Sequence, residues 1–349
     1  MIKFIKNSFI VFFLLFQLQY VNAQVVNAKS EDFKEITTRP LIVQLVTEDA
    51  YMVEDLEKRI SKTSNAKRRT EFEIELNAYR EFISSYNLLI KDAIKKIWLL
   101  NKEKPIEFKT FSEVQDIRRV NSRNYSLLQF VQTKLWVTND YGKETFTAKT
   151  IPTLVYSRME KAEPYDDNFN KKIDYSIYLP FINSRSNQQL LESDLIIILK
   201  IMQNHISEIQ TYDKKNYTAF DFAKDQDEEF CDLLKGQTLL LDEKLLDKKT
   251  SKQDISKAYT GNLNVIATEE ISKSINQAED VPVSIVLPYS IKHDKSGIPG
   301  LESSELIMYI KCFVNAKTAN FYSCYGTKAV DNWEPFFKTQ EFKKIEKSK

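Results

Sequence analysis

One stretch of the sequence occurs twice, and this repetition constrains the fold more than any other feature. Residues 175–204 and 283–315 both contain Ser-Ile-x-Leu-Pro-aromatic, a polar loop, Leu-Glu-Ser, an acid followed by Leu-Ile, and a closing Lys and Asn. An internal repeat indicates two units of related structure. We therefore expect a mixed α/β (α+β) fold with two related lobes. Each lobe is expected to hold a strand–helix–strand portion, an antiparallel β-hairpin and a following helix.

The second copy decides how we interpret the apolar run of the first. Leu195–Met202 alone is compatible with a buried helix, but its counterpart Leu306–Val314 is rich in β-branched and aromatic residues. A polar turn and a second aromatic run, Phe321–Tyr325, follow that counterpart, as in a hairpin. We therefore predict hairpins in both copies. In the first copy, Gln203–Ser207 is the turn and Glu208–Tyr212 the return strand.

The order of elements upstream of the repeat is also similar in the two halves. Phe108-x-x-x-Ser-Glu-Val and Val265-x-x-Thr-Glu-Glu-Ile each join an expected strand to an expected helix, so the duplication is predicted to reach back to Ile106 and Leu263. A mature chain of about 325 residues suggests about two domains. We place the first lobe at 24–212 and the second at 213–349.

The first 23 residues have the pattern of a secretory signal peptide. Lys3 and Lys6 precede the apolar run Phe9–Phe16, and Ala23 stands before the expected cleavage position. The apolar run is shorter than the roughly 20 residues that cross a bilayer. We therefore expect an exported mature chain that starts near Gln24, without a transmembrane segment, in the periplasm or outside the cell.

A long amphipathic helix is predicted over residues 70–100. Thr70 and Glu73 form the pattern of a capping box. Apolar residues then alternate in steps of four and three: Phe72, Leu76, Tyr79, Ile83, Tyr86, Ile90, Ala93 and Ile97. Such a seam occurs in coiled-coil dimers and in helices packed within one chain. Further apolar residues widen the stripe here, which favours packing within the chain and a monomer.

The charge balance argues against a nucleic-acid partner. The formal net charge is +1, and it becomes −1 once Lys3 and Lys6 leave with the signal peptide, since 48 basic and 49 acidic residues remain. Nucleic-acid binding requires a basic surface that attracts phosphates. Two local basic groups, Lys67–Arg69 and Arg118–Arg119, are flanked by acids and are interpreted as solvent-exposed faces.

Known catalytic and ligand-binding motifs do not occur in the sequence. Six scattered glycines form neither a P-loop nor a G-x-G-x-x-G loop, and a G-x-S-x-G elbow is also missing. The two histidines, His205 in the expected first turn and His293 in the second loop, occupy non-equivalent repeat positions and are not assigned a role. Asp166–Asn170 resembles the start of a calcium loop, but Lys171 and Ile177 replace its diagnostic Gly and Glu. No catalytic, cofactor-binding or metal-ligating residue is therefore assigned.

Three cysteines exclude a disulfide-rich scaffold. Cys312 and Cys324 lie on opposite arms of the second expected hairpin, so a cross-strand disulfide forms only if the register places them opposite each other. Cys231 lies on the apolar side of a predicted helix and is interpreted as a core residue.

The sequence thus supports two hypotheses on function. The first is an exported, non-catalytic binding or scaffold protein, whose partner is another envelope protein or a peptide. The alternative is an exported hydrolase with a carboxylate-based site that no motif reveals. The second repeat loop, with His293, Asp294 and Gly297-Ile-Pro-Gly300, is where we expect the two copies to differ in binding.

Overall fold

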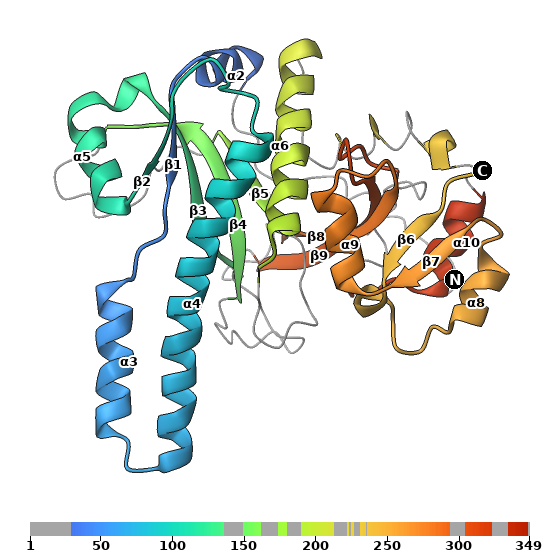
Figure 1. Cartoon of the computed structure of the whole chain (residues 1–349), viewed down its shortest axis with the longest axis horizontal. Helices are drawn as coiled ribbons and strands as arrows, with labels where there is room; N and C mark the ends of the chain where they lie inside the picture. Colours follow the sequence, from blue (N-terminus) through green and yellow to red (C-terminus); the bar gives the residue numbers. More distant parts are fainter. Residues whose placement is uncertain are drawn as a thin grey trace, which may run out of the picture.

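The protein has a mixed α/β fold with two mixed sheets, in agreement with the predicted class (Figure 1). The structure is a computed structural model. It describes residues 29–135, 149–161, 174–179, 190–212, 222, 225–226, 231–234, 236–293, 304–322 and 334–347.

The first sheet has five strands in the order β2-β1-β3-β4-β5. Its strands are β1 (Leu41–Gln44), β2 (Ile106–Lys109), β3 (Ser126–Leu135), β4 (Lys149–Arg158) and β5 (Tyr175–Tyr178). β1 is parallel to both β2 and β3, whereas β4 is antiparallel to both β3 and β5. The strand predicted from Ile106 is thus present as β2.

The second sheet has four strands in the order β7-β6-β8-β9. They are β6 (Leu239–Asp242), β7 (Leu263–Ile266), β8 (Pro282–His293) and β9 (Ser304–Asn315). β6 is parallel to β7 and β8, and β8 is antiparallel to β9. Each sheet therefore has a central strand with parallel neighbours on both sides and an antiparallel strand beyond one of them. Strands β2-β1-β3-β4 of the first sheet thus have the same topology as β7-β6-β8-β9, and the duplication itself stays a prediction.

The hairpins predicted for the two repeat copies are wrong. The Ser-Ile segments are strands in both copies, β5 and β8, but Leu195–Met202 belongs to the helix α6 (Glu192–Tyr212). In the second copy, β9 pairs along its whole length with β8, and Phe321 makes only one bridge, to Val314. Topologically, β8 and β9 correspond to β3 and β4, not to β5 and α6.

Helix α6 lies between the two sheets, and this position explains why it is apolar on nearly all sides (Figure 1). Its buried side chains join one core cluster that includes Leu128 of β3 and Tyr156 of β4 from the first sheet, and Val283 of β8 and Val314 of β9 from the second. A helix that is hydrophobic all round is one that other elements cover completely.

Alternation along the strands divides the remaining core into two outer clusters. In β1, Val43 faces α6 and Ile42 faces α5 (Phe111–Asn121); in β9, Val314 faces α6 and Phe313 faces α10 (Thr339–Lys347). The described residues also form α2 (Ser30–Thr37), α8 (Lys252–Ala258) and α9 (Thr268–Asn276), with short 3₁₀ turns at Ser122–Asn124, Cys231–Leu234 and Glu243–Leu245. A period of two along a strand places alternate side chains on opposite faces.

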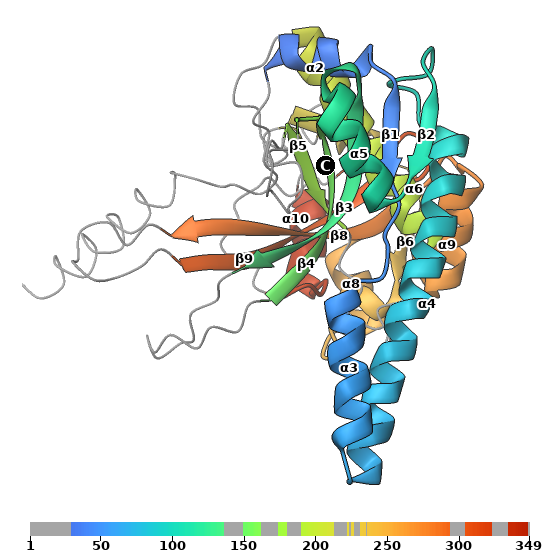
Figure 2. The same cartoon turned by 90° about the vertical axis from the view of Figure 1, so that its left-hand side faces the viewer.

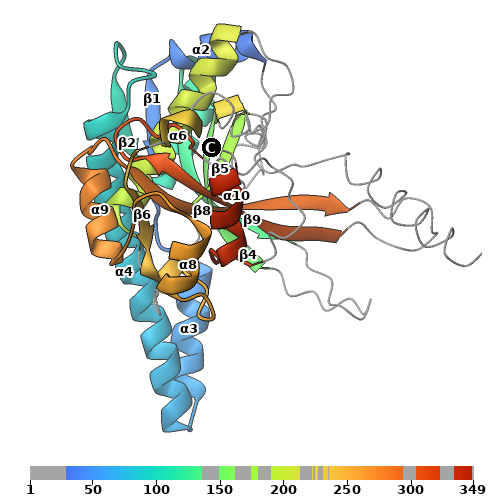
Figure 3. The same ribbon diagram turned by 90° about the vertical axis from the view of Figure 1, so that its right-hand side faces the viewer.

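Two further helices, α3 (Ala50–Lys62) and α4 (Ala66–Ile97), form a hairpin that extends away from both sheets (Figures 1–3). α4 is the predicted long helix. It begins earlier than the Thr70 capping box suggested, because the Asn65 side chain accepts a hydrogen bond from the Arg68 amide, 3.2 Å away. The seam from Leu76 onward packs within the chain, next to α6 and the first sheet. In the part of the chain that the structure describes, no helix combines the length and apolarity needed to cross a membrane.

Candidate functional site

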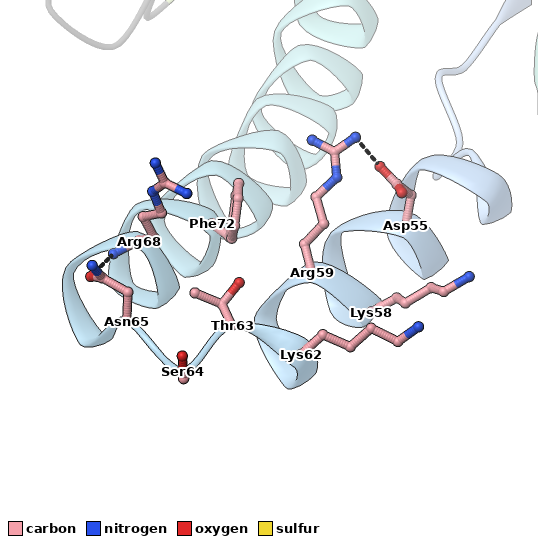
Figure 4. A pocket seen from close by; sticks show the side chains of 9 residues that line it. All are labelled: Asp55, Lys58, Arg59, Lys62, Thr63, Ser64, Asn65, Arg68 and Phe72. Atoms are coloured by element: carbon pink, nitrogen blue, oxygen red, sulfur yellow. Dashed lines mark hydrogen bonds and ion pairs between the residues drawn. The ribbon is translucent and has the colours of Figure 1, made fainter.

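The end of the α3–α4 hairpin carries a surface hollow of about 470 Å³. Its lining comes from the last two turns of α3, the three-residue connection and the first turns of α4: Asp55, Lys58, Arg59, Lys62, Thr63, Ser64, Asn65, Arg68 and Phe72 (Figure 4). Arg59 and Arg68 extend on either side of Phe72, whereas Lys58 and Lys62 point away from α4. The hollow therefore combines four cations, the Asp55 carboxylate, two hydroxyl groups, one amide and one aromatic ring.

Positive charge is concentrated at this end of the hairpin. Residues 58–69, which we name the basic tip, contain six Lys or Arg residues and no acidic residue: Lys58, Arg59, Lys62, Lys67, Arg68 and Arg69. Since the formal charge of the whole chain is +1, removing these six charges leaves −5 for everything else. A nearly neutral chain thus carries a small basic region, and acidic residues slightly outnumber basic ones in the rest of it.

The basic tip lies beyond the apolar core. In α3 only Leu56 is buried, and in α4 the first buried residue is Leu76. At 1.5 Å per residue, the ten residues of α4 before Leu76 extend about 15 Å past the core. None of the residues 57–71 is buried, so their side chains add little to hydrophobic stabilisation.

Contacts between the two helices hold the hairpin together along its length. Near the tip, the Arg59 guanidinium of α3 lies 5.9 Å from the centre of the Phe72 ring of α4. Asp55, one turn earlier in α3, holds this guanidinium through an ion pair of 2.6 Å. Farther down, Arg80 of α4 bridges Glu48 and Glu57 at 3.2 and 3.3 Å. Such exposed pairs each contribute at most about 1 kcal/mol, but together they fix the direction of the arm.

The usual ligand position in parallel sheets, at the carboxyl ends of the central strands, is filled by the protein's own side chains. At the end of β6, Asp242 accepts hydrogen bonds from Thr268 Oγ1 (3.1 Å) and from the Lys244 amide (2.9 Å). At the end of β1, the Asn87 side chain of α4 binds both the amide and the carbonyl of Val46, at 2.9 and 2.8 Å. The polar groups at both strand ends therefore make hydrogen bonds within the protein that connect neighbouring elements.

Two further buried carboxylates have cationic partners. Arg158 at the end of β4 lies 3.0 Å from Asp174 and 2.5 Å from Asp32, and so connects the sheet to α2. In the second sheet, Lys311 Nζ of β9 lies 2.7 Å from Glu341 of α10. These carboxylates belong to separate parts of the molecule and do not converge in one pocket.

His205 is a core residue, and its predicted place in an exposed turn is wrong. It lies within α6, is fully buried, and its Nδ1 is 3.0 Å from the Tyr175 hydroxyl. Its ring stacks on Phe222 with a centroid distance of 4.6 Å. Arg118 was expected to be exposed to solvent, and this prediction is also wrong. Its side chain is 1% exposed and donates to the Glu160 carbonyl at 3.1 Å.

Several predictions fall on residues outside the described ranges. These are the signal peptide, the polar loop Asp166–Asn170, the loop Asp294–Gly300 and Cys324. His293 is the last residue of β8, and Cys312 is buried, with Sγ 3.8 Å from the Ile285 carbonyl of β8. Among the residues that the structure describes, no three His, Cys, Asp or Glu side chains are close enough to hold a metal ion.

No protein-family model matches the chain, and no curated protein or solved structure is significantly similar to it.

The sequence revealed half of the basic tip. Lys67–Arg69 was correctly expected to be exposed, but Lys58, Arg59 and Lys62 were not connected with it. The signal was the arrangement of the six cations, three on either side of the polar segment Thr63–Asn65. A polar break between two helical stretches predicts a hairpin, and a hairpin would bring both groups to one end.

Proposed function

We propose that the chain is an exported, non-catalytic binding or scaffold protein of the periplasm or cell surface, which contacts its partner through the basic tip. The observation that carries this proposal is an arm that extends about 15 Å past the core, has no buried residue between 57 and 71, and concentrates six cations at its end. Such a surface adds little to folding, and its charge makes it suited to recognition.

Two further observations support the proposal. The N-terminal pattern of a basic segment, an apolar run and Ala23 is typical of exported proteins. The buried carboxylates Asp174, Asp242 and Glu341 take part in contacts that hold elements together. The second candidate, an exported hydrolase with a carboxylate-based site, requires carboxylates that meet in a pocket, and no observation within the described ranges favours it.

Photo-crosslinking in the cells that naturally produce the protein tests the proposal. A photoreactive amino acid replaces Ser64 in the basic tip, and in a control chain it replaces Lys249, an exposed residue of the second lobe. We expect the exported fraction to contain the chain and to show a discrete adduct from position 64 that position 249 does not give. A chain retained in the cytoplasm, or equal adducts from both positions, would contradict the proposal.

A shortened arm provides a second variant of the same experiment. Replacing Glu57–Glu71 by Gly-Ser-Gly removes all six cations and no buried side chain, while Leu56 and Leu76 stay in place. The variant should therefore fold with a thermal midpoint close to that of the unchanged chain, and co-purification of the crosslinked component should be lost. A shortened chain that still retains this component would show that the tip is not the contact.

A further inference from the structure

From the arrangement of the basic tip we infer the chemistry of its partner: an extended acidic segment of a polypeptide, rich in Asp and Glu. This inference rests on the proposed function, because it specifies what the same surface binds. It follows from two properties of the tip, which are the directions of its cations and the side chains that line the hollow.

The cations of the tip point in different directions. Lys67, Arg68 and Arg69 are consecutive in α4, and successive residues of an α-helix are about 100° apart around its axis. Lys58 and Lys62 extend away from Arg68 on the other helix (Figure 4). These charges cannot converge on one small anion such as phosphate. They match a ligand that carries several negative charges along its length.

The hollow offers the contacts that such a polypeptide segment needs. Arg68 can bind a carboxylate through two parallel N–H donors, because a planar guanidinium suits this geometry, whereas the Arg59 guanidinium is already paired with Asp55. Between them, Thr63, Ser64 and Asn65 present polar groups to a peptide backbone. A volume of about 470 Å³ has room for a few side chains and is far larger than one carboxylate requires.

Membranes and nucleic acids fit the same surface less well. Membrane-binding helices carry exposed apolar anchors beside their basic residues, whereas the exposed large apolar residues of this arm, Tyr51, Met52 and Ile74, lie outside the basic tip. A duplex carries a high density of phosphates over a long surface, and six cations at the end of one arm would contact only a few of them.

Fluorescence anisotropy with a labelled probe tests the inference on the mature chain. The probe is a 12-residue peptide of alternating Glu and Ser, and the control peptide has Gln in place of Glu. We expect the acidic peptide to bind at low salt, at least tenfold more tightly than its Gln counterpart, and to weaken as salt screens the charges.

Paired variants locate the binding. Lys62→Gln combined with Arg68→Gln removes one cation from each helix, and Lys248→Gln combined with Lys249→Gln removes the same charge from an exposed loop of the second lobe. The tip pair should weaken peptide binding at least tenfold, and the loop pair less than twofold. Equal effects of the two pairs would overturn the inference, since they would reflect net charge alone.

Competing ligands decide between partners. Three competitors are compared with the acidic peptide: inorganic phosphate, a 12-nucleotide single strand, and vesicles with three parts phosphatidylglycerol to seven parts phosphatidylcholine. The inference is overturned if any of them binds the tip as tightly as the peptide does. It is also overturned if sedimentation shows a salt-sensitive dimer that needs the tip, because the partner is then a second copy. The crosslinking experiment at position 64 can be repeated in the Lys62→Gln, Arg68→Gln chain. An adduct that persists there would support the proposed function and contradict the inference that the partner is acidic.

Discussion

At the scale of single residues, the ion pair between Lys311 and Glu341 connects β9 to α10. Both side chains are almost completely buried, and the Lys311 ammonium also donates to the Phe336 carbonyl at 3.1 Å. The second oxygen of Glu341 accepts from the Lys338 amide at 2.9 Å, which fixes the start of the helix. Burying two charges is favourable only when both are paired and hydrogen-bonded, as they are here.

Breaking this pair should strongly destabilise the protein. Lys311→Met leaves a buried carboxylate without its cation, and we expect a loss of about 3–5 kcal/mol in the free energy of unfolding, measured with urea. Lys343 is an exposed lysine of α10, and Lys343→Met should change the free energy of unfolding by less than about 0.5 kcal/mol. Adding Glu341→Gln to the first variant should restore part of the loss. Similar effects of the two single substitutions would show that the pair contributes little.

Buried tyrosines should make the fold sensitive to alkaline pH. Burial raises the pKa of Tyr86, Tyr156 and Tyr175 far above the ordinary value of 10.0. Below pH 10 these hydroxyls are protonated in both the folded and the unfolded chain, and their contribution is fully present. Above pH 10 they ionise only in the unfolded chain, so stability falls as the pH rises.

The expected slope above pH 10 is about 1.4 kcal/mol per pH unit for each such tyrosine. Urea unfolding between pH 8 and pH 11.5 should therefore show a constant stability that then decreases steeply. Tyrosinate absorbance from the three buried rings should rise together with unfolding. Tyr86→Phe should reduce the slope by the contribution of one group, since burial alone raises the pKa of Tyr86. An unchanged slope in this variant would contradict the assignment.

At the scale of elements, the sequence predicted most strands and helices from local patterns. The strands that begin at Ile106 and Leu263, and the helices α5 and α9 that follow them, lie where the paired upstream patterns predict them. The N-terminus of α5 is a clear example, because Thr110 and Glu113 form a reciprocal capping box. Local hydrogen bonds determine such boundaries, and a local pattern can therefore predict them.

Helix α6 could not be predicted in this way. Leu195–Met202 and Leu306–Val314 have similar residues, yet the first is helical and the second is a strand. A run of Ile and Leu satisfies either structure, and its surroundings decide: α6 is covered by helices and by both sheets, whereas β9 pairs with β8 along twelve residues. Tertiary packing thus overrides the weak strand preference of the isoleucines.

The same reasoning explains what was predicted of the candidate site. The exposure of Lys67–Arg69 follows from its charge, but the meeting of these residues with Lys58 and Lys62 depends on the direction of α3 relative to α4. That direction is set by contacts distant in sequence, such as Arg80 with Glu48 and the Asp49 amide with the Tyr79 hydroxyl, 2.9 Å away.

At the scale of the whole molecule, the two sheets depend on one another through α6. Lys200 of this helix donates to the carbonyls of Ala316 and Lys317, both at 2.9 Å, and Asn204 donates to that of Thr318 at 2.8 Å. The opposite side of α6 packs on α2 and α4, in the same core cluster. Residues on either side of the predicted lobe boundary at 212 thus share one core, and we expect them to unfold together.

Native-state hydrogen exchange can measure this coupling. Ile198, which is fully buried in α6, contacts no outer cluster, and Ile198→Ala should cost about 2–5 kcal/mol through lost burial and the cavity that remains. Because α6 belongs to the core of both sheets, amides in β1 and in β6 should lose protection by the same amount. If protection falls in β1 while β6 keeps its original value, the two sheets unfold independently, and α6 is then an element of the first sheet alone.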